Sequence, residues 1–67
     1  MNYEDLKVHL ETEIDSSSLT YVLRVLEAAC LDKATSHLLS AQSDKSLVIG
    51  WEADARDIRR CAEKVRN

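Results

Sequence analysis

The chain contains no proline and a single glycine, so almost nothing in its 67 residues forces a helix to end. Proline and glycine are the residues that interrupt helices most strongly. Helix boundaries therefore have to be found from clusters of capping residues, whose side-chain oxygens accept hydrogen bonds from the free amides of a helix start. Two clusters rich in Ser and Asp, at residues 15–18 and 43–46, divide the chain into three segments.

The first segment predicts a short amphipathic helix over residues 2–14. Its apolar side chains recur at steps of three, four and four residues, which aligns them on one helix face. They are Tyr3, Leu6, Leu10 and Ile14. Asn2 is suited to cap this helix, and Lys7 with Glu11 forms an ion pair one turn apart. We expect this helix to dock on the rest of the chain through its apolar stripe.

The second segment, residues 18–41, is apolar on more than one side of a helix. One face carries Leu19, Leu23, Leu26, Cys30, His37 and Ala41. The opposite side carries Tyr21, Val25, Ala28 and Leu39. The charged residues that interrupt this surface are Arg24, Glu27, Asp32 and Lys33. A helix that is apolar nearly all round must be buried nearly all round, so this segment is expected to be the central helix. A new helix start at Asp32 is an alternative to one unbroken helix.

The third segment, residues 44–66, is predicted to be one continuous helix. Its apolar residues step by three and four, as in a heptad pattern: Val48, Trp51, Ala55, Ile58, Ala62 and Val65. This pattern runs through Gly50, where glycine costs about 1 kcal/mol relative to alanine and where the missing side chain allows another helix to approach closely. The alternative is a strand at residues 46–50 followed by a helix capped by Asp54, because β-branched residues precede the glycine.

Together these segments predict one all-α domain over residues 1–67, a small three-helix arrangement with a long central second helix. A domain of about 60 residues buries only about 60% of the surface that its unfolded chain exposes. A core of this size rarely supplies more than about 3 to 5 kcal/mol of stability. Because two short neighbours do not cover the central helix, we expect the chain to be oligomeric and its surplus apolar surface to meet a partner.

The net charge of -3 argues against indiscriminate binding to nucleic acid or anionic membranes. The charge is uneven, with five acidic residues and one lysine in residues 1–18 but five basic and four acidic residues in residues 52–67. The sequence lacks a secretory signal pattern and any run of about 18 apolar residues that would span a membrane. With only two cysteines, we expect a soluble protein in a reducing, cytoplasmic setting.

The residues that bind metals or perform catalysis form no recognisable motif. Cys30, Cys61, His9 and His37 supply four zinc-type ligands, but no two of them form the tight pairs typical of structural zinc sites. Ser36 precedes His37, and neighbouring residues of a helix point about 100° apart. A core this small leaves little room for a ligand pocket of about 300 Å³. The sequence therefore predicts no enzyme activity, no cofactor and no metal site.

A basic stripe recurs every four residues near the end of the third segment, where it is suited to contact phosphates. It consists of Arg56, Arg60 and Lys64. Acidic neighbours offset the stripe, because Glu52 can pair with Arg56 and Glu63 with Arg59, while Asp57 lies beside it. No aromatic residue is interleaved for base stacking. Nucleic-acid binding is therefore the alternative function, and a solvated helix face is the simpler interpretation.

We expect a non-enzymatic protein-interaction or regulatory module, a homodimer that presents an apolar helical surface to a second copy or to another protein. The residues expected at this surface are Tyr21, Val25, Ala28 and Leu39, with Trp51 as an anchor. Tryptophan supplies a large apolar area and is enriched at binding hot spots. The alternative is a small nucleic-acid-binding regulator that uses Arg56, Arg60 and Lys64, in which dimerisation spaces two helices along a duplex.

Overall fold

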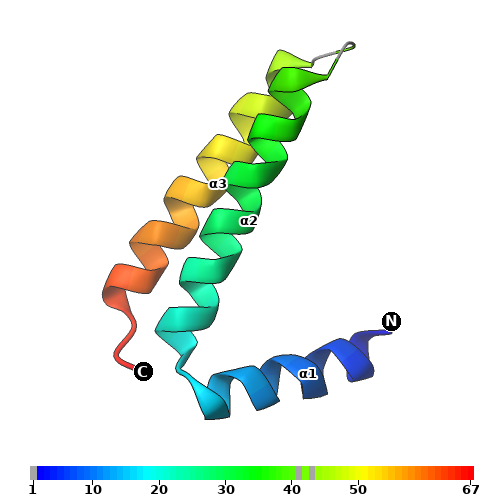
Figure 1. Ribbon diagram of the computed structural model, residues 1–67. Coiled ribbons are helices and arrows are strands. Elements are labelled where there is room, and N and C mark those ends of the chain that lie inside the picture. The colour runs from blue at the N-terminus through cyan, green and yellow to red at the C-terminus, as the bar shows by residue number, and fades with distance from the viewer. Residues whose placement is uncertain (1, 41, 43) are drawn as a thin grey trace.

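The computed structural model describes residues 2–40, 42 and 44–67, and over these residues the chain forms three helices and no strand (Figure 1). The helices are α1 (Tyr3–Ser16), α2 (Leu19–Leu39) and α3 (Lys45–Lys64). At 21 residues, α2 is the longest. It packs against α3 in an antiparallel hairpin, whereas α1 points away from the base of the hairpin. The predicted all-α fold with a long second helix is confirmed.

Each helix begins at a capping residue of the predicted kind. The side chain of Asn2 accepts a hydrogen bond from the amide of Asp5 at 2.8 Å, and Ser18 accepts one from Tyr21 at 2.9 Å. Asp44 caps α3 by accepting from the amide of the residue two positions on. These bonds satisfy amides that have no partner inside the helix, and so they fix where each helix starts.

The helix ends differ slightly from the sequence prediction. The first helix extends two residues further, through Ser16, while α2 ends at Leu39 because the backbone at Ser40 is extended. Residue 41, which was expected in the second helix, lies outside the described residues. The third helix ends at Lys64 because the backbone turns extended at the next residue.

Two open questions about helix continuity are answered by the backbone. The third helix runs unbroken through Gly50, so the alternative of a strand at residues 46–50 is wrong. The second helix runs unbroken through Asp32, so no new helix begins there. An added Cβ at Gly50 would have nothing within 4 Å, so among the described residues no helix of the same chain makes the expected close approach at this glycine.

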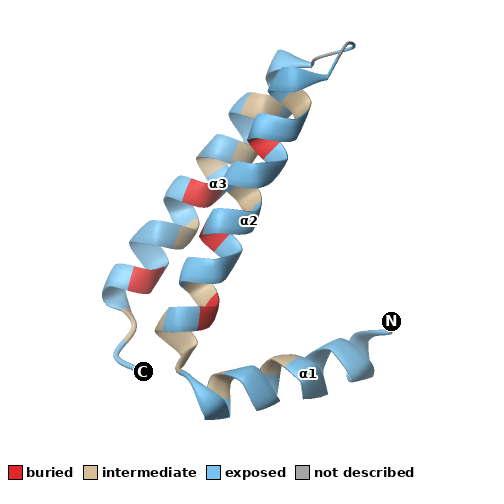
Figure 2. Cartoon of the chain, viewed as in Figure 1, coloured by how far each residue is buried: buried red, intermediate tan, exposed pale blue. Residues whose placement is uncertain are grey.

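The hairpin is held together by a thin line of small side chains (Figure 2). Its buried apolar residues are Val22, Ala34, Ala55 and Ala62. Three of the four are alanines, whose size lets two helices pack closely. Half-buried neighbours complete the predicted stripe of α3, including Val48, Trp51 and Ile58. The end of the chain is tied back to the hairpin, since the amide and hydroxyl of Thr20 both donate to the carbonyl oxygen of Asn67, at 2.7 and 2.9 Å.

The first helix contributes little to this packing. No residue of α1 is buried, and among the described residues it touches only α2. The molecule is consequently flat and angular, measuring 39 × 29 × 15 Å (Figure 1). The predicted amphipathic pattern and the Lys7–Glu11 ion pair, at 3.9 Å, are present. The expected docking is limited to the corner where α1 meets α2, because the helix leaves the hairpin there instead of lying along it.

Candidate interaction surface

Four of the five residues expected at the interface are exposed on α2. Tyr21 is 58% exposed, Val25 51% and Leu39 78%, and Ala28 is also exposed. The fifth, Trp51, is half-buried on α3, where its position in the heptad pattern directs it toward the hairpin contact. Within the described residues, the structure therefore leaves an apolar face of α2 largely exposed.

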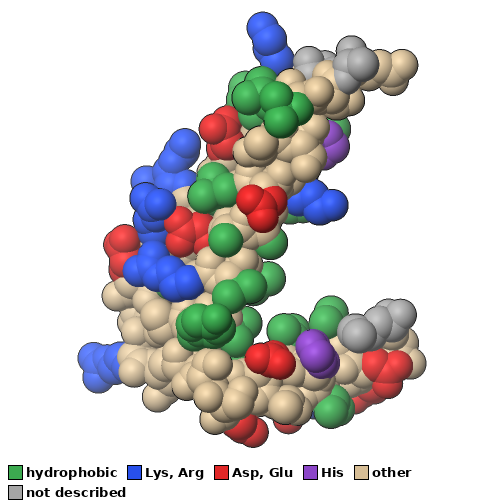
Figure 3. Space-filling model, viewed as in Figure 1, with side chains coloured by type: hydrophobic (Ala, Val, Ile, Leu, Met, Phe, Trp, Pro, Cys, Tyr) green, Lys and Arg blue, Asp and Glu red, His purple; other side chains and the backbone are tan. Residues whose placement is uncertain are grey.

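Two of these residues lie in a groove that we call the elbow groove, formed where α1 and α2 meet. Its volume is about 240 Å³. It is lined by His9, Leu10 and Glu13 from α1 and by Tyr21, Val22, Val25 and Leu26 from α2. Figure 3 shows hydrophobic side chains on both sides of the angle between the hairpin and α1. Leu39 and Trp51 do not line this groove, so the structure does not join all five expected residues into one site.

The apolar surface continues from the elbow groove along α1. A second hollow is lined by Tyr3, Leu6, Lys7 and Leu10. Leu10 lines both hollows, so the two surfaces are continuous. Tyr3 is 75% exposed and Leu6 is 46% exposed, although both belong to the stripe that was expected to dock. The stripe itself was predictable from the sequence, but its shared surface with α2 was not, since the relative orientation of two helices is not encoded in either pattern.

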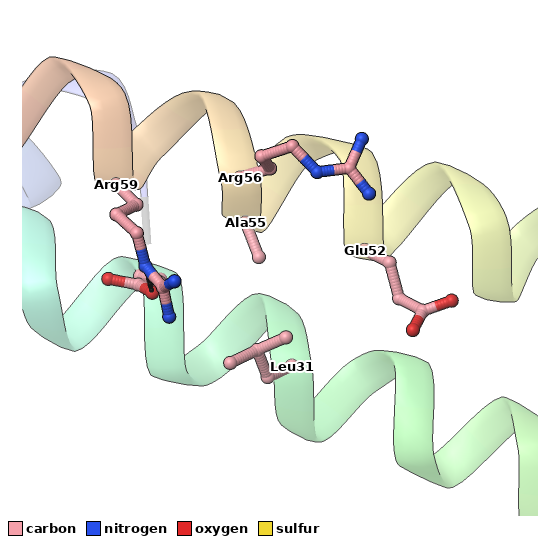
Figure 4. Close-up of a pocket in the computed structure, with 6 residues that line it drawn as sticks. Leu31, Glu52, Ala55, Arg56 and Arg59 are labelled. Atoms are coloured by element: carbon pink, nitrogen blue, oxygen red, sulfur yellow. Dashed lines mark hydrogen bonds and ion pairs between the residues drawn. The ribbon is translucent and has the colours of Figure 1, made fainter.

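A separate polar groove lies between α2 and α3 (Figure 4), with a volume of about 200 Å³. It is lined by Glu27, Leu31, Glu52, Ala55, Arg56 and Arg59. Glu27 is only 6% exposed. The Nε of Arg59 donates to its carboxylate at 2.7 Å, and Nη1 of Arg24 donates to the other oxygen at 3.4 Å. The Arg59 hydrogen bond, with help from Arg24 and against the effect of burial, holds the pKa of Glu27 below its usual range.

This ion pair joins the two helices of the hairpin. Both carboxylate oxygens of Glu27 accept hydrogen bonds from arginines, so the group is suited to bridge helices and not to take up a proton near neutral pH. Arg59 was expected to pair with Glu63, but in the structure it pairs with Glu27, which had been identified only as an interruption of the apolar helix. The available signal was spacing, because Glu27 falls on the stripe between Leu23 and Cys30 that faces α3.

The basic stripe lies on the exposed side of α3. Arg56, Arg60 and Lys64 are all exposed, as expected for either a solvated face or a phosphate contact. Nη1 of Arg60 lies 3.9 Å from a carboxylate oxygen of Asp57. Arg56 lines the polar groove together with Glu52 (Figure 4). Acidic groups are thus interleaved with the stripe in space as well as in sequence.

The zinc-type ligands are spread over all three helices. His9 is in α1, Cys30 and His37 are in α2, and Cys61 is in α3. Within the part of the chain that the structure describes, no three His, Cys, Asp or Glu side chains are grouped in a way that could hold a metal ion.

In that same part, none of the helices combines the length and the apolar character needed to cross a membrane.

Comparison of the chain with protein-family models, with curated proteins and with solved structures finds no match. Its function is therefore inferred from the exposed surfaces and the charges of the chain itself.

Proposed function

We propose that this protein is a non-enzymatic protein-interaction or regulatory module that works as a homodimer through the apolar surface of α2. The observation that supports this proposal is the exposure of Tyr21, Val25 and Leu39, each more than half exposed. Apolar patches of this kind on small domains mark sites of association, because covering them contributes about 25 cal/mol for each Å² removed from water.

The thin core of the hairpin supports the same proposal. Its buried apolar side chains comprise one valine and three alanines. In the described residues, no side chain is buried to below 2% exposure. A chain that buries so little by itself gains most of its stability from association, and folding then depends on the concentration of the partner.

Trp51 is retained in the proposal as an anchor at the edge of the surface. It is half-buried and borders a shallow hollow together with Ser46, Leu47, Gly50 and Asp54. A tryptophan at such an edge has apolar area available to a partner while it still packs against its own helix pair. We also retain a reducing, cytoplasmic setting, which is supported by Cys30 and Cys61 being free thiols.

We do not extend the proposal to nucleic acid, because no feature of the basic stripe favours phosphate over its own acidic neighbours. Arg60 pairs with Asp57, and the chain carries a net charge of -3.

The dependence of binding on salt concentration separates nucleic-acid binding from self-association through an apolar surface. Binding through phosphate contacts weakens steeply as ionic strength rises, whereas an apolar interface changes little. Phosphate contacts are progressively screened over salt concentrations of about 50 to 500 mM. Over this range we expect the dissociation constant of self-association to stay nearly constant.

The proposal is tested by Tyr21→Asp and Leu39→Asp, which place a charge on the exposed face of α2. We expect at least one variant to weaken self-association in light scattering while helical content, measured by circular dichroism, stays close to that of the wild type. A buried charge without a partner is costly, so the effect appears only if the residue is covered by a partner. If both variants unfold, these positions belong to the core and the proposal is wrong.

A further inference from the structure

One chain exposes more surface than a compact monomer of its mass. Its accessible area is 5378 Å², whereas a folded monomer of 7.6 kDa exposes about 4,300 Å². Its radius of gyration over Cα atoms is 13.9 Å, compared with about 11 Å for a compact domain of this length. The excess of about 1,100 Å² exceeds the roughly 800 Å² that each partner contributes to a stable interface of standard size.

Part of the exposed apolar surface lies in the angle between α1 and the hairpin, at Tyr21, Val25 and Leu26. One wall of the elbow groove is α2, which lines it with Tyr21, Val22, Val25 and Leu26. These residues extend over about 8 Å of the α2 axis, which is close to the 8 to 10 Å spacing between the axes of packed helices. Beyond it, the exposed charges of Asp32 and Lys33 make the wall polar. The groove is therefore shaped for a single helix.

The helix that fits is α1 of a second copy. The chain's own α1 has an apolar stripe that is exposed at Tyr3 and Leu6 and that opens onto the same hollow surface. Its 14 residues span about 21 Å, enough to cross the groove and cover the stripe of a neighbouring α1. We infer that the elbow groove of each chain receives α1 of the other, with the two elbows interlocked about a two-fold axis.

This inference rests on the proposed homodimer and specifies its contact. In a two-fold interface the same patch is used by both copies, and with the axis perpendicular to α1 the two α1 helices run antiparallel. The N-terminal half of each then reaches Tyr21 and Val25 of its partner, and Leu6 lies near the axis. Val8 projects from a different side of α1 and is 61% exposed, so it serves as a matched control. Leu39 lies more than one helix diameter beyond the groove and is left outside the contact.

The test compares Leu6→Asp with Val8→Asp in the full chain, using light scattering over a dilution series. We expect Leu6→Asp to raise the dissociation constant of the dimer by about tenfold or more, and Val8→Asp to change it by less than about threefold. Circular dichroism checks that both variants keep the hairpin, which is expected because α1 buries no side chain. A cross-link formed by Leu6→Cys but not by Val8→Cys, in a chain with Cys30→Ala and Cys61→Ser, confirms the contact independently.

The outcomes separate the inference from the function on which it rests. If Leu6→Asp and Val8→Asp leave dimerisation unchanged while Tyr21→Asp weakens it, the homodimer stands and the exchange of α1 is wrong. If the wild-type chain has the mass of one chain at every concentration, both the homodimer and the binding of a second copy's α1 in the elbow groove are wrong. The groove would then be a site for a different protein.

Discussion

The hairpin and α1 have the same kinds of sequence pattern, but their apolar stripes are buried to different extents. Both begin at capped helix starts and carry apolar stripes at helical spacing. The hairpin buries its stripe between α2 and α3 and adds an ion pair between Glu27 and Arg59 at 2.7 Å. The first helix has no buried residue, only the half-buried Leu10 and Ile14, and leaves Tyr3 and Leu6 exposed.

The difference shows that an amphipathic stripe predicts which face of a helix is to be buried, but not the surface against which that face packs. The stripes of α2 and α3 meet each other because a short connection makes them antiparallel neighbours, and alanines at Ala55 and Ala62 allow close packing. The connection before α2 instead directs α1 away from the hairpin. The hairpin buries its stripe within its own chain, whereas we propose that α1 buries its stripe against a second copy.

The largest expected effect breaks the hairpin by overpacking it. Ala55 is 2% exposed, so Ala55→Leu forces the helices apart and lowers the free energy of unfolding by about 1 to 3 kcal/mol. Urea denaturation followed by circular dichroism measures this change. Ile49→Ala on the same helix is the control, because Ile49 is 65% exposed and its loss changes stability by less than about 0.5 kcal/mol. Equal effects of the two substitutions would show that Ala55 does not lie at a packed contact.

A smaller effect, an increase in stability, is expected at Gly50 of α3. Gly50 lies in the helix interior with nothing within 4 Å of an added Cβ, and its φ angle is not positive. Gly50→Ala therefore removes the helix penalty of glycine without a clash and raises the free energy of unfolding by about 1 kcal/mol. Denaturant titration at fixed chain concentration measures the gain. A loss of stability would mean that this position touches something in the assembled protein.

The smallest effect concerns the charges that link α2 and α3. The pKa of Glu27 is lowered in the folded chain, so its ion pair stabilises the fold fully above the ordinary glutamate pKa of about 4.3 and is lost as pH falls through the lowered value. Arg59→Ala reduces this acid-dependent part of the stability, and Arg60→Ala does not. The effect is modest because the Arg59 side chain is 59% exposed and water screens the pair. Thermal melts at pH 7 and pH 3 provide the comparison, and identical pH dependence in both variants would contradict it.

Much of this architecture was predictable from periodicity. The six apolar positions of the third helix are all buried or half-buried, and the α2 residues assigned to its opposite side are all exposed. Helix starts were predictable because capping depends on a few neighbouring atoms, as at Asn2 and Ser18.

The rest depends on how the helices are placed, which no single segment determines. Leu26 shares a predicted face with Leu23 and Cys30, but it is 43% exposed and lines the elbow groove. Because Leu26 lies at the edge of the stripe, it can contact a helix that packs on either side of α2. Glu27 was expected only as a charged interruption of the apolar helix, yet it is buried, and its partner Arg59 lies on the other helix, 32 residues away in sequence.

The pairing of two elbows is tested most directly by the molar mass of the wild-type chain, measured by size exclusion with light scattering over a dilution series. We predict a mass twice the 7.6 kDa of one chain, falling toward one chain only at the lowest concentrations. A mass of one chain at every concentration, with helical content unchanged, would contradict it.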